Sequence, residues 1–300
     1  MKRILSATYK IYTTGMSGLA DVLHLGHSRG EKSLAESADQ FADKDFEDLD
    51  KEATTLGNAY RGIGVIIAIL GALIIFSAIV PVAFDLHGAS YWFFGVTEVL
   101  AMLLVVALVT YAKKSRLHTK WRDTRRAAEN KRYEHFSTLI EKARTSPTSE
   151  NTTKLLEEAV SHLEGENSQI DYNLSKSRTY HKIETLSGKL GWGGFALALI
   201  GALGHLSTHW NGLLILTVFV PALVGALHGL NSFLKLDDLA YDHKSTADQL
   251  TKLKTDITHS VIESNQEAEL IDTAESIYHT LVSRDKQWAD KIGTQNLQAT

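Results

Sequence analysis

The chain contains no cysteine and only three prolines among its 300 residues. The absence of cysteine excludes disulfide bonds, thiolate-bound metals and lipidated cysteines. No segment has the phosphate-binding glycine loop, the HExxH helix or the GxSxG turn of common enzyme classes. The sequence therefore predicts no catalytic residues, no cofactor and no metal, and the distribution of its apolar residues carries most of the information.

Charged residues are missing from long stretches of the chain. Residues 62–84 and 190–234 contain no Asp, Glu, Lys or Arg, and residues 86–112 contain one, Glu98. A helix of about 20 apolar residues crosses a hydrocarbon core about 30 Å thick. The pattern therefore predicts four transmembrane helices arranged as two hairpins. The predicted spans are 62–84, 91–112, 189–207 and 212–234.

A soluble protein with buried core helices is the alternative. The mean hydropathy of -0.09 and the hydrophobic fraction of 44% would suit such a protein. Core helices of soluble proteins usually keep a charged face, however, and these stretches have none. We therefore predict an all-α integral membrane protein with a cytoplasmic helical bundle.

Basic residues predict the orientation in the membrane. Nine Lys and Arg residues lie between residues 113 and 132, directly after the second span, and further lysines precede the third. The hairpin tips, 85–90 and 207–211, contain neither Lys nor Arg. The positive-inside rule then places both termini of this multi-pass protein in the cytoplasm. Lys10 interrupts any apolar region near the start, so no cleavable signal peptide is predicted.

Five segments follow from these assignments. They are an N-terminal cytoplasmic helical region (1–60), a first hairpin (61–112), central cytoplasmic helices (113–188), a second hairpin (189–234) and C-terminal cytoplasmic helices (235–300). Leucines at helical spacing predict that the cytoplasmic helices pack as a bundle. The clearest break is "TSPTSENTT" (145–153), where Ser149 or Asn151 is expected to cap the next helix.

The two hairpins resemble each other in sequence. "GVIIAILGAL" (64–73) aligns with "GFALALIGAL" (194–203). Membrane helices use few residue types, so short matches also arise by chance, but the shared topology favours duplication. Small residues recur at four-residue spacing and predict close helix packing within the bundle or between subunits. These residues are Gly64, Ala68, Ala72, Gly194, Ala198, Ala202, Gly225 and Gly229.

Glu98 is the least expected residue of the four spans. A carboxylate in hydrocarbon costs on the order of a few kcal/mol and normally faces protein or water. Glu98 is predicted to lie about 10 Å inside its span. Two roles are open: a pore or gate residue, or a neutral acid that only hydrogen-bonds a neighbouring helix. His228 and Asn231, near the cytoplasmic end of the fourth span, are further pore or gate candidates, and Pro221 is expected to kink that span.

The basic segment after the second span has two interpretations. Contact with anionic lipid is the favoured one. Alternatively, Arg122, Arg125 and Arg126 bind the phosphates of a nucleotide. Direct binding of nucleic acid is not expected. His205 and His209 have a spacing that suits a metal, but their position favours polar residues at the membrane interface.

Three segments carry a family resemblance. They are "YRGIGVIIAILGAL" (60–73), "YAKKSRLHTKWRDTRRAAENKRYEHF" (111–136) and "ESIYHTLVSRDKQWADKI" (275–292). With the two-hairpin plan, they resemble the SMODS-associated four-transmembrane effector family and the related SLATT two-transmembrane families. The resemblance implies an antiphage effector that forms a homo-oligomer and permeabilises or depolarises the inner membrane. It also implies activation by a cyclic nucleotide or a sensor protein. A small ion channel or transporter and a membrane-anchored helical scaffold remain alternatives.

Overall fold

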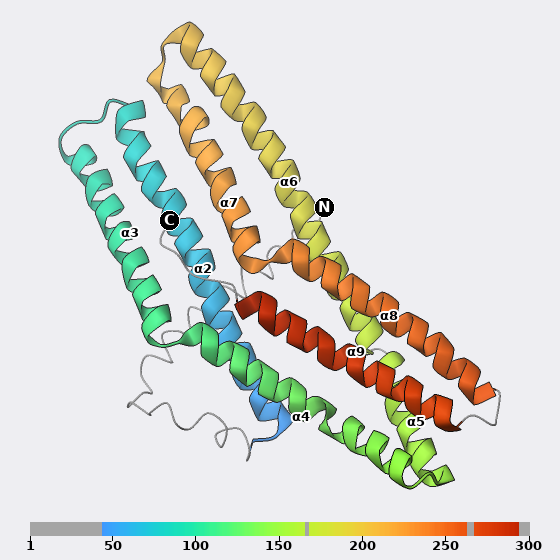
Figure 1. The fold of residues 1–300 in the computed structure, drawn as a ribbon. Helices are drawn as coiled ribbons and strands as arrows, with labels where there is room; N and C mark the ends of the chain where they lie inside the picture. The colour runs from blue at the N-terminus through green and yellow to red at the C-terminus, as the bar shows by residue number, and fades with distance from the viewer. Residues whose placement is uncertain (1–43, 166–167, 263–266, 294–300) are drawn as a thin grey trace.

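The described residues of the computed structural model, 44–165, 168–262 and 267–293, fold into helices joined by short connections (Figure 1). This confirms the predicted all-α fold. Most of the predicted N-terminal region lies outside the described residues. The elements are α2 (Phe46–Ala83), α3 (Ala89–Lys114), α4 (Leu117–Thr145), α5 (Ser149–Leu163), α6 (Gln169–Thr208), the 3-10 turn η2 (Asn211–Leu213), the π-helical turn η3 (Ile215–Phe219), α7 (Val220–Leu234), α8 (Leu236–Ile262) and α9 (Glu267–Gly293).

Four helical segments are long and apolar enough to cross a membrane, as predicted: α2, α3, α6 and the run from η2 into α8. Their apolar parts form an open row in the order α3, α2, α7, α6 (Figure 1). Within this row α2 packs against α3 and α7, and α7 packs against α2 and α6. The helices α3 and α6 therefore form the two ends of the row.

The helices of each hairpin leave the membrane layer in different ways. α2 and α6 continue without a break into the layer of helices that the sequence predicts to be cytoplasmic, so the predicted boundaries at 60/61 and 188/189 fall inside helices. α3 and α7 end at sharp breaks, where Arg116 and Lys235 adopt left-handed φ angles of 49° and 53°. Each hairpin thus has one continuous helix and one helix that turns at a basic residue.

The two hairpins share a helix register. Arg116 and Lys235, which end the second helix of each hairpin, differ by 119 in residue number. With this offset, the buried residues Val105 and Val109 of α3 correspond to Val224 and His228 of α7. Val105 and Val109 belong to the buried face of α3, which packs on α2. Val224 and His228 correspondingly contact glycines of α6. The unit α6–α7–α8 therefore repeats the plan of α2–α3–α4.

The fourth span is irregular just before Pro221. The π-helical turn η3 comes directly before α7, and Pro221 is the second residue of α7. Proline has no N–H to donate to the carbonyl four residues earlier, so the helical hydrogen-bond ladder is interrupted here. The irregularity expected at this proline takes the form of a π-helical turn.

The helices predicted to be cytoplasmic share the largest apolar core of the described residues. It joins α4, α5, the start of α6, α8 and α9, and is centred on Phe136, Leu155, Leu250 and Ile277, all almost fully buried. The predicted cap of α5 is wrong: Thr148 is the N-cap and accepts a hydrogen bond from the Asn151 backbone N–H at 3.2 Å. Ser149 is already the first helical residue, because the chain enters the helix from extended Thr148.

Candidate functional site

Glu98 lies on the face of α3 that packs against α2. It precedes buried Ala101 by three residues and Val105 by seven, which places all three on one helical stripe. The side chain is half-buried. Glu98 follows the first residue of α3, Ala89, by nine residues, which corresponds to about 14 Å of helix. Glu98 therefore lies further from the start of its helix than the sequence predicts, because α3 begins two residues earlier than expected.

Ring contacts show the depth of Glu98 relative to α2. Phe94, one turn before Glu98, lies 6.5 Å from Phe76 of α2 between ring centroids. In this antiparallel pair, Glu98 is level with Ala72, in the middle of the predicted span 62–84. The neighbouring Gly71 has no heavy atom within 4 Å of the position of a Cβ. Glu98 is thus level with the small residues Gly71 and Ala72 of α2, and the space beside Gly71 is open.

His228 lies on the opposite side of α2 from Glu98. Its Nε2 atom is 3.0 Å from the Cβ position of Gly191, so the ring packs against α6. Asn231 is half-buried one turn closer to the end of the span that is predicted to be cytoplasmic. Since α2 separates α3 from α7 in the row, the structure does not bring Glu98 together with the other two pore candidates.

The second hairpin has Thr217 where the first has Glu98, by the shared register of 119 residues. The Thr217 hydroxyl donates to the backbone carbonyls of Leu213 at 3.3 Å and Leu214 at 3.2 Å. Its methyl group lies 3.3 Å from the Cβ position of Gly201. The polar group of the second hairpin is therefore satisfied within its own helix, and the carboxylate has no counterpart there.

The predicted small residues divide into two groups. A Cβ at Gly64 would overlap the ring of Phe233, and one at Gly194 would lie 2.5 Å from Val224. Both glycines therefore admit side chains of α7, one from each side of that helix. Gly225 and Gly229 have no heavy atom within 4 Å of a Cβ position. Of the alanines, Ala68 packs against the cluster around Val65, Ala72 and Ala198 are half-buried, and Ala202 is exposed.

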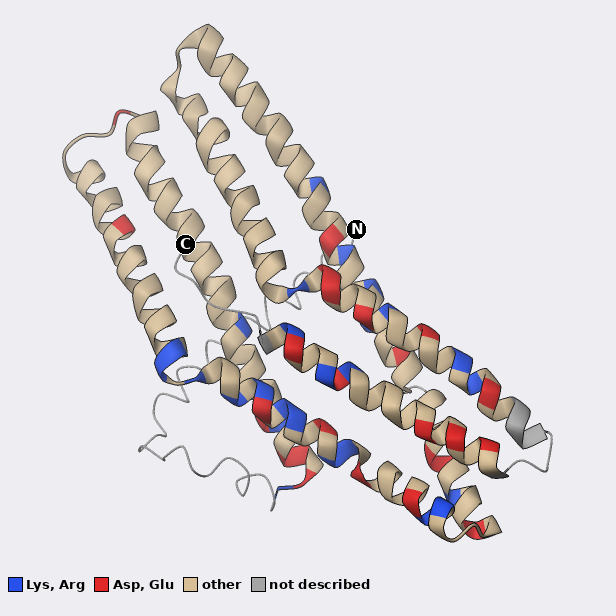
Figure 2. Ribbon diagram, viewed as in Figure 1, with Lys and Arg blue, Asp and Glu red and all other residues tan. Residues whose placement is uncertain are grey.

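The three candidate arginines have different surroundings. Arg125 donates to Asp50 at 2.6 Å and also pairs with Glu129. Arg122 pairs with its neighbour Asp123 at 3.1 Å, whereas Arg126 is exposed. Figure 2 shows the charged residues concentrated in the layer predicted to be cytoplasmic, below the four apolar helices, which carry very few. Both partners of Arg125 belong to the helical bundle, so Arg126 is the most exposed of the three arginines.

A buried charge cluster between α4 and α9 is absent from the sequence predictions. Glu129 is 3% exposed and pairs with Arg125 and Arg132. Asp285 and Arg284 of α9 complete the cluster, with a 2.5 Å ion pair between them. Burial raises the pKa of Glu129, the charge of Asp285 adds to this effect, and the three arginines oppose it. The only sequence signal was Glu129 itself, a charge beside buried Ala128 on the apolar stripe of α4.

A second buried polar contact joins α6 and α8. His243 Nδ1 is 2.6 Å from Asn173 Oδ1, and Asn173 is fully buried. Burial, together with the positive charges of Arg284 and Lys176, lowers the pKa of His243 to about 3. The imidazole is therefore neutral at physiological pH and donates to the Asn173 carbonyl. Burial also lowers the pKa values of His118 and His162.

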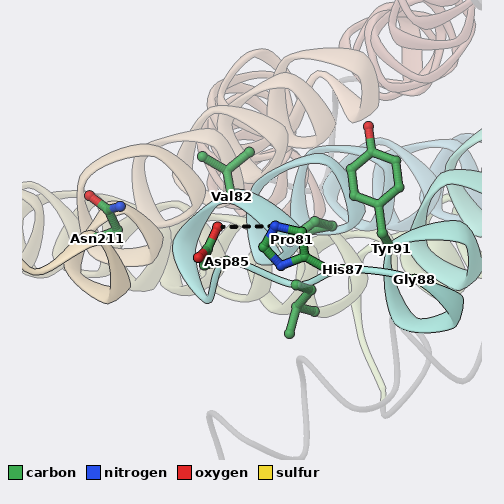
Figure 3. Close-up of a pocket in the computed structure, with 8 residues that line it drawn as sticks. Pro81, Val82, Asp85, His87, Gly88, Tyr91 and Asn211 are labelled. Carbon is green, nitrogen blue, oxygen red and sulfur yellow. Dashed lines mark ion pairs between the residues drawn. The ribbon is translucent and has the colours of Figure 1, made fainter.

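An open hollow of about 560 Å³ lies between the outer tips of the two hairpins (Figure 3). It is lined by residues of the first hairpin tip and by Asn211 of the second hairpin. Asp85 Oδ1 and His87 Nε2 are 3.8 Å apart, but their side chains are 90% and 80% exposed. The hollow therefore marks where the two tips meet and has no enclosed polar site. Across the part of the chain that the structure describes, no three His, Asp or Glu side chains are grouped to hold a metal.

Comparison with known proteins identifies one family. Residues 46–137 match the profile of a family described as a protein of unknown function, DUF4231. No curated protein and no solved structure matches the chain. The match spans α2, α3 and most of α4, which is the first of the two repeated units. It gives no activity, so the resemblance to the SMODS-associated and SLATT families stays a prediction.

Proposed function

We propose that this protein is a membrane effector that forms a homo-oligomer and permeabilises or depolarises the bacterial inner membrane when it is activated. The position of Glu98 supports the proposal most directly. A carboxylate near the centre of a bilayer needs water or a protein partner. Glu98 is half-buried on the face of α3 that packs against α2, at one end of the open row. A shift of α3 relative to α2, when copies assemble at this end, would give the carboxylate an aqueous path.

The cytoplasmic helices are the proposed site of activation. The family resemblance favours a nucleotide second messenger or a sensor protein in antiphage defence. Arg126, exposed on α4, is the first candidate for contact with the phosphates of such a ligand. Arg122 is the second, because its partner Asp123 is a sequence neighbour at a partly exposed position. Anionic lipid headgroups offer the same chemistry and are the competing ligand.

A membrane-anchored helical scaffold is the second candidate function. The largest apolar core of the described residues lies in the cytoplasmic bundle rather than between the membrane helices. A scaffold needs a rigid cytoplasmic platform and no path through the bilayer. It predicts that Glu98 can be replaced without effect on membrane permeability.

Reconstitution of the full chain into dye-loaded liposomes tests the proposal. Purified protein is compared with and without candidate cyclic nucleotides, alongside Glu98→Gln, Glu98→Leu and the matched control Thr217→Val. We expect activated wild type and Thr217→Val to release dye, and Glu98→Leu to match empty liposomes. A small channel or transporter would instead give ion flux without activation. If no condition gives leakage and infected cells keep their membrane potential, the effector proposal fails and the scaffold is favoured.

A further inference from the structure

The last described helix, α9, connects the two repeated units. It lies between α4 of the first unit and α8 of the second and packs against both (Figure 1). The shorter α5 also touches both units, but it packs mainly on α4 and α9. The arrangement of the two cytoplasmic layers therefore depends on α9.

Polar contacts of α9 reach both units. Towards the first unit, Glu275 pairs with Arg144 of α4 at 2.5 Å. Towards the second unit, Lys291 donates to Asp242 of α8 at 2.6 Å. Arg284, between these two positions, reaches Asn173 of α6 at 3.5 Å. Each end of α9 is thus held by charge to a different unit.

The C-terminal end of α9 lies under the membrane layer. The ring of Trp288 is 5.5 Å from that of Trp121 in an edge-to-face contact. Ile292 belongs to the same apolar cluster as Tyr60 and Ile63 of α2. Directly above this cluster, Gly64 meets Phe233 where the two hairpins touch. The end of α9 therefore supports the contact between α2 and α7.

The contact between α9 and α4 is chemically unlike the rest of the bundle. It buries Glu129 beside the Arg284–Asp285 pair, and the Tyr133 hydroxyl and Asp285 Oδ2 have no hydrogen-bond partner there. Buried ion pairs add little stability relative to apolar packing, and unsatisfied polar atoms reduce it. Displacement of α9 would return these charged and polar groups to water, which offsets part of the free energy lost by exposing the apolar side chains of the same contact.

We propose that α9 is a displaceable clasp that holds the two membrane hairpins in a resting arrangement. Displacement of α9 removes Trp288 and Ile292 from beneath α2 and breaks the bridge between α4 and α8. The hairpins are then free to separate where α2 meets α7. The consequence for permeability rests on the proposed effector function, whereas the separation of the hairpins does not.

Cross-linking tests the clasp in a chain that has no native cysteine. Arg144→Cys and Glu275→Cys are joined by a short, cleavable bis-maleimide in the reconstituted protein. The control joins Glu150→Cys to Lys154→Cys, an ion pair within α5. We expect the α4–α9 cross-link to suppress activated dye release until the linker is cleaved, and the control to release dye as wild type. Full release from the cross-linked α4–α9 protein would overturn the clasp.

A charge swap with a readout other than leakage separates the two proposals. Spin labels on Asp85→Cys and Asn211→Cys, which line the same hollow, report the distance between the hairpin tips. Lys291→Asp should lengthen this distance and increase hydrogen exchange in α9, and adding Asp242→Lys should reverse both changes. An unchanged distance despite faster exchange in α9 rejects the clasp. Reversible separation in a protein that never leaks supports the clasp and rejects the effector function.

Discussion

The two units of the chain, α2–α3–α4 and α6–α7–α8, have the same helical plan but different polar residues. The first has Glu98 at mid-depth where the second has Thr217, and the second has His228 where the first has apolar Val109. Apolar stripes and small residues are sufficient to repeat the fold. The polar groups are not repeated, so we expect the two units to differ in function. The family match to the first unit alone agrees with this divergence.

Exchange of the two mid-depth residues tests this difference most directly. Glu98→Thr should abolish activated dye release, because the apolar stretches 62–84, 86–112 and 190–234 then contain no carboxylate. Adding Thr217→Glu should not restore release, because position 217 lies in a tight contact with α6. In this contact the Cβ position of Gly201 is only 2.6 Å from Leu216. Liposome release measures both variants. Restoration by the double variant would show that the units are interchangeable.

Breaking the buried ion pair between Arg125 and Glu129 in the first unit is expected to have the second largest effect. Arg125→Gln leaves Glu129 almost fully buried with Arg132 at 3.4 Å as its remaining partner on α4. Loss of one partner of a buried ion pair costs about 3 kcal/mol. We expect a loss of this size in unfolding experiments in detergent. Arg125→Gln combined with Glu129→Gln should recover part of it, because no buried charge is then left unpaired.

The glycines of α2 differ according to their neighbours. Gly64→Leu forces a side chain into the ring of Phe233 and should destabilise the contact between hairpins by about 1–3 kcal/mol. Gly71→Ala is the matched control on the same helix, since its Cβ meets no atom within 4 Å. Thermal unfolding in detergent compares the two. Equal stability of both variants would contradict the packing of α2 against α7.

The four apolar helices were predictable from the sequence, because a stretch of about 20 apolar residues without a charge is typical of a transmembrane helix. Their order in the row was not, because it depends on shape, such as the fit of Phe233 against Gly64. The buried cluster was missed for a different reason. Glu129 and Asp285 are distant in sequence, and each resembles a surface charge on an amphipathic helix. The unusual Glu98 was visible at once, but its depth required the register between α2 and α3.

Acid should weaken the second unit more than the first. The pKa of His243 is lowered to about 3 by burial, against about 6.5 in the unfolded chain, so the unfolded state binds a proton first as the pH falls. Stability is therefore lost progressively below about pH 6.5, by about 1 kcal/mol between pH 7 and 5.5. His243→Thr, which introduces the residue found at the equivalent Thr124 of α4, should reduce this slope. Denaturant unfolding at both pH values measures it; an unchanged slope would assign the effect to His118 and His162.

The smallest expected effect comes from Lys244 and Asp248, the counterparts of Arg125 and Glu129 in the second unit. Their atoms are 2.6 Å apart, as close as a buried pair, but their side chains are 57% and 59% exposed. Water screens exposed ion pairs, so Lys244→Gln should cost less than about 0.5 kcal/mol. Measuring the unfolding of Lys244→Gln and of Arg125→Gln side by side compares two ion pairs of the same helical spacing, one exposed and one buried. A large loss at Lys244 would mean that this face of α8 is covered in the assembled protein, since burial is what makes the equivalent pair of α4 costly to break.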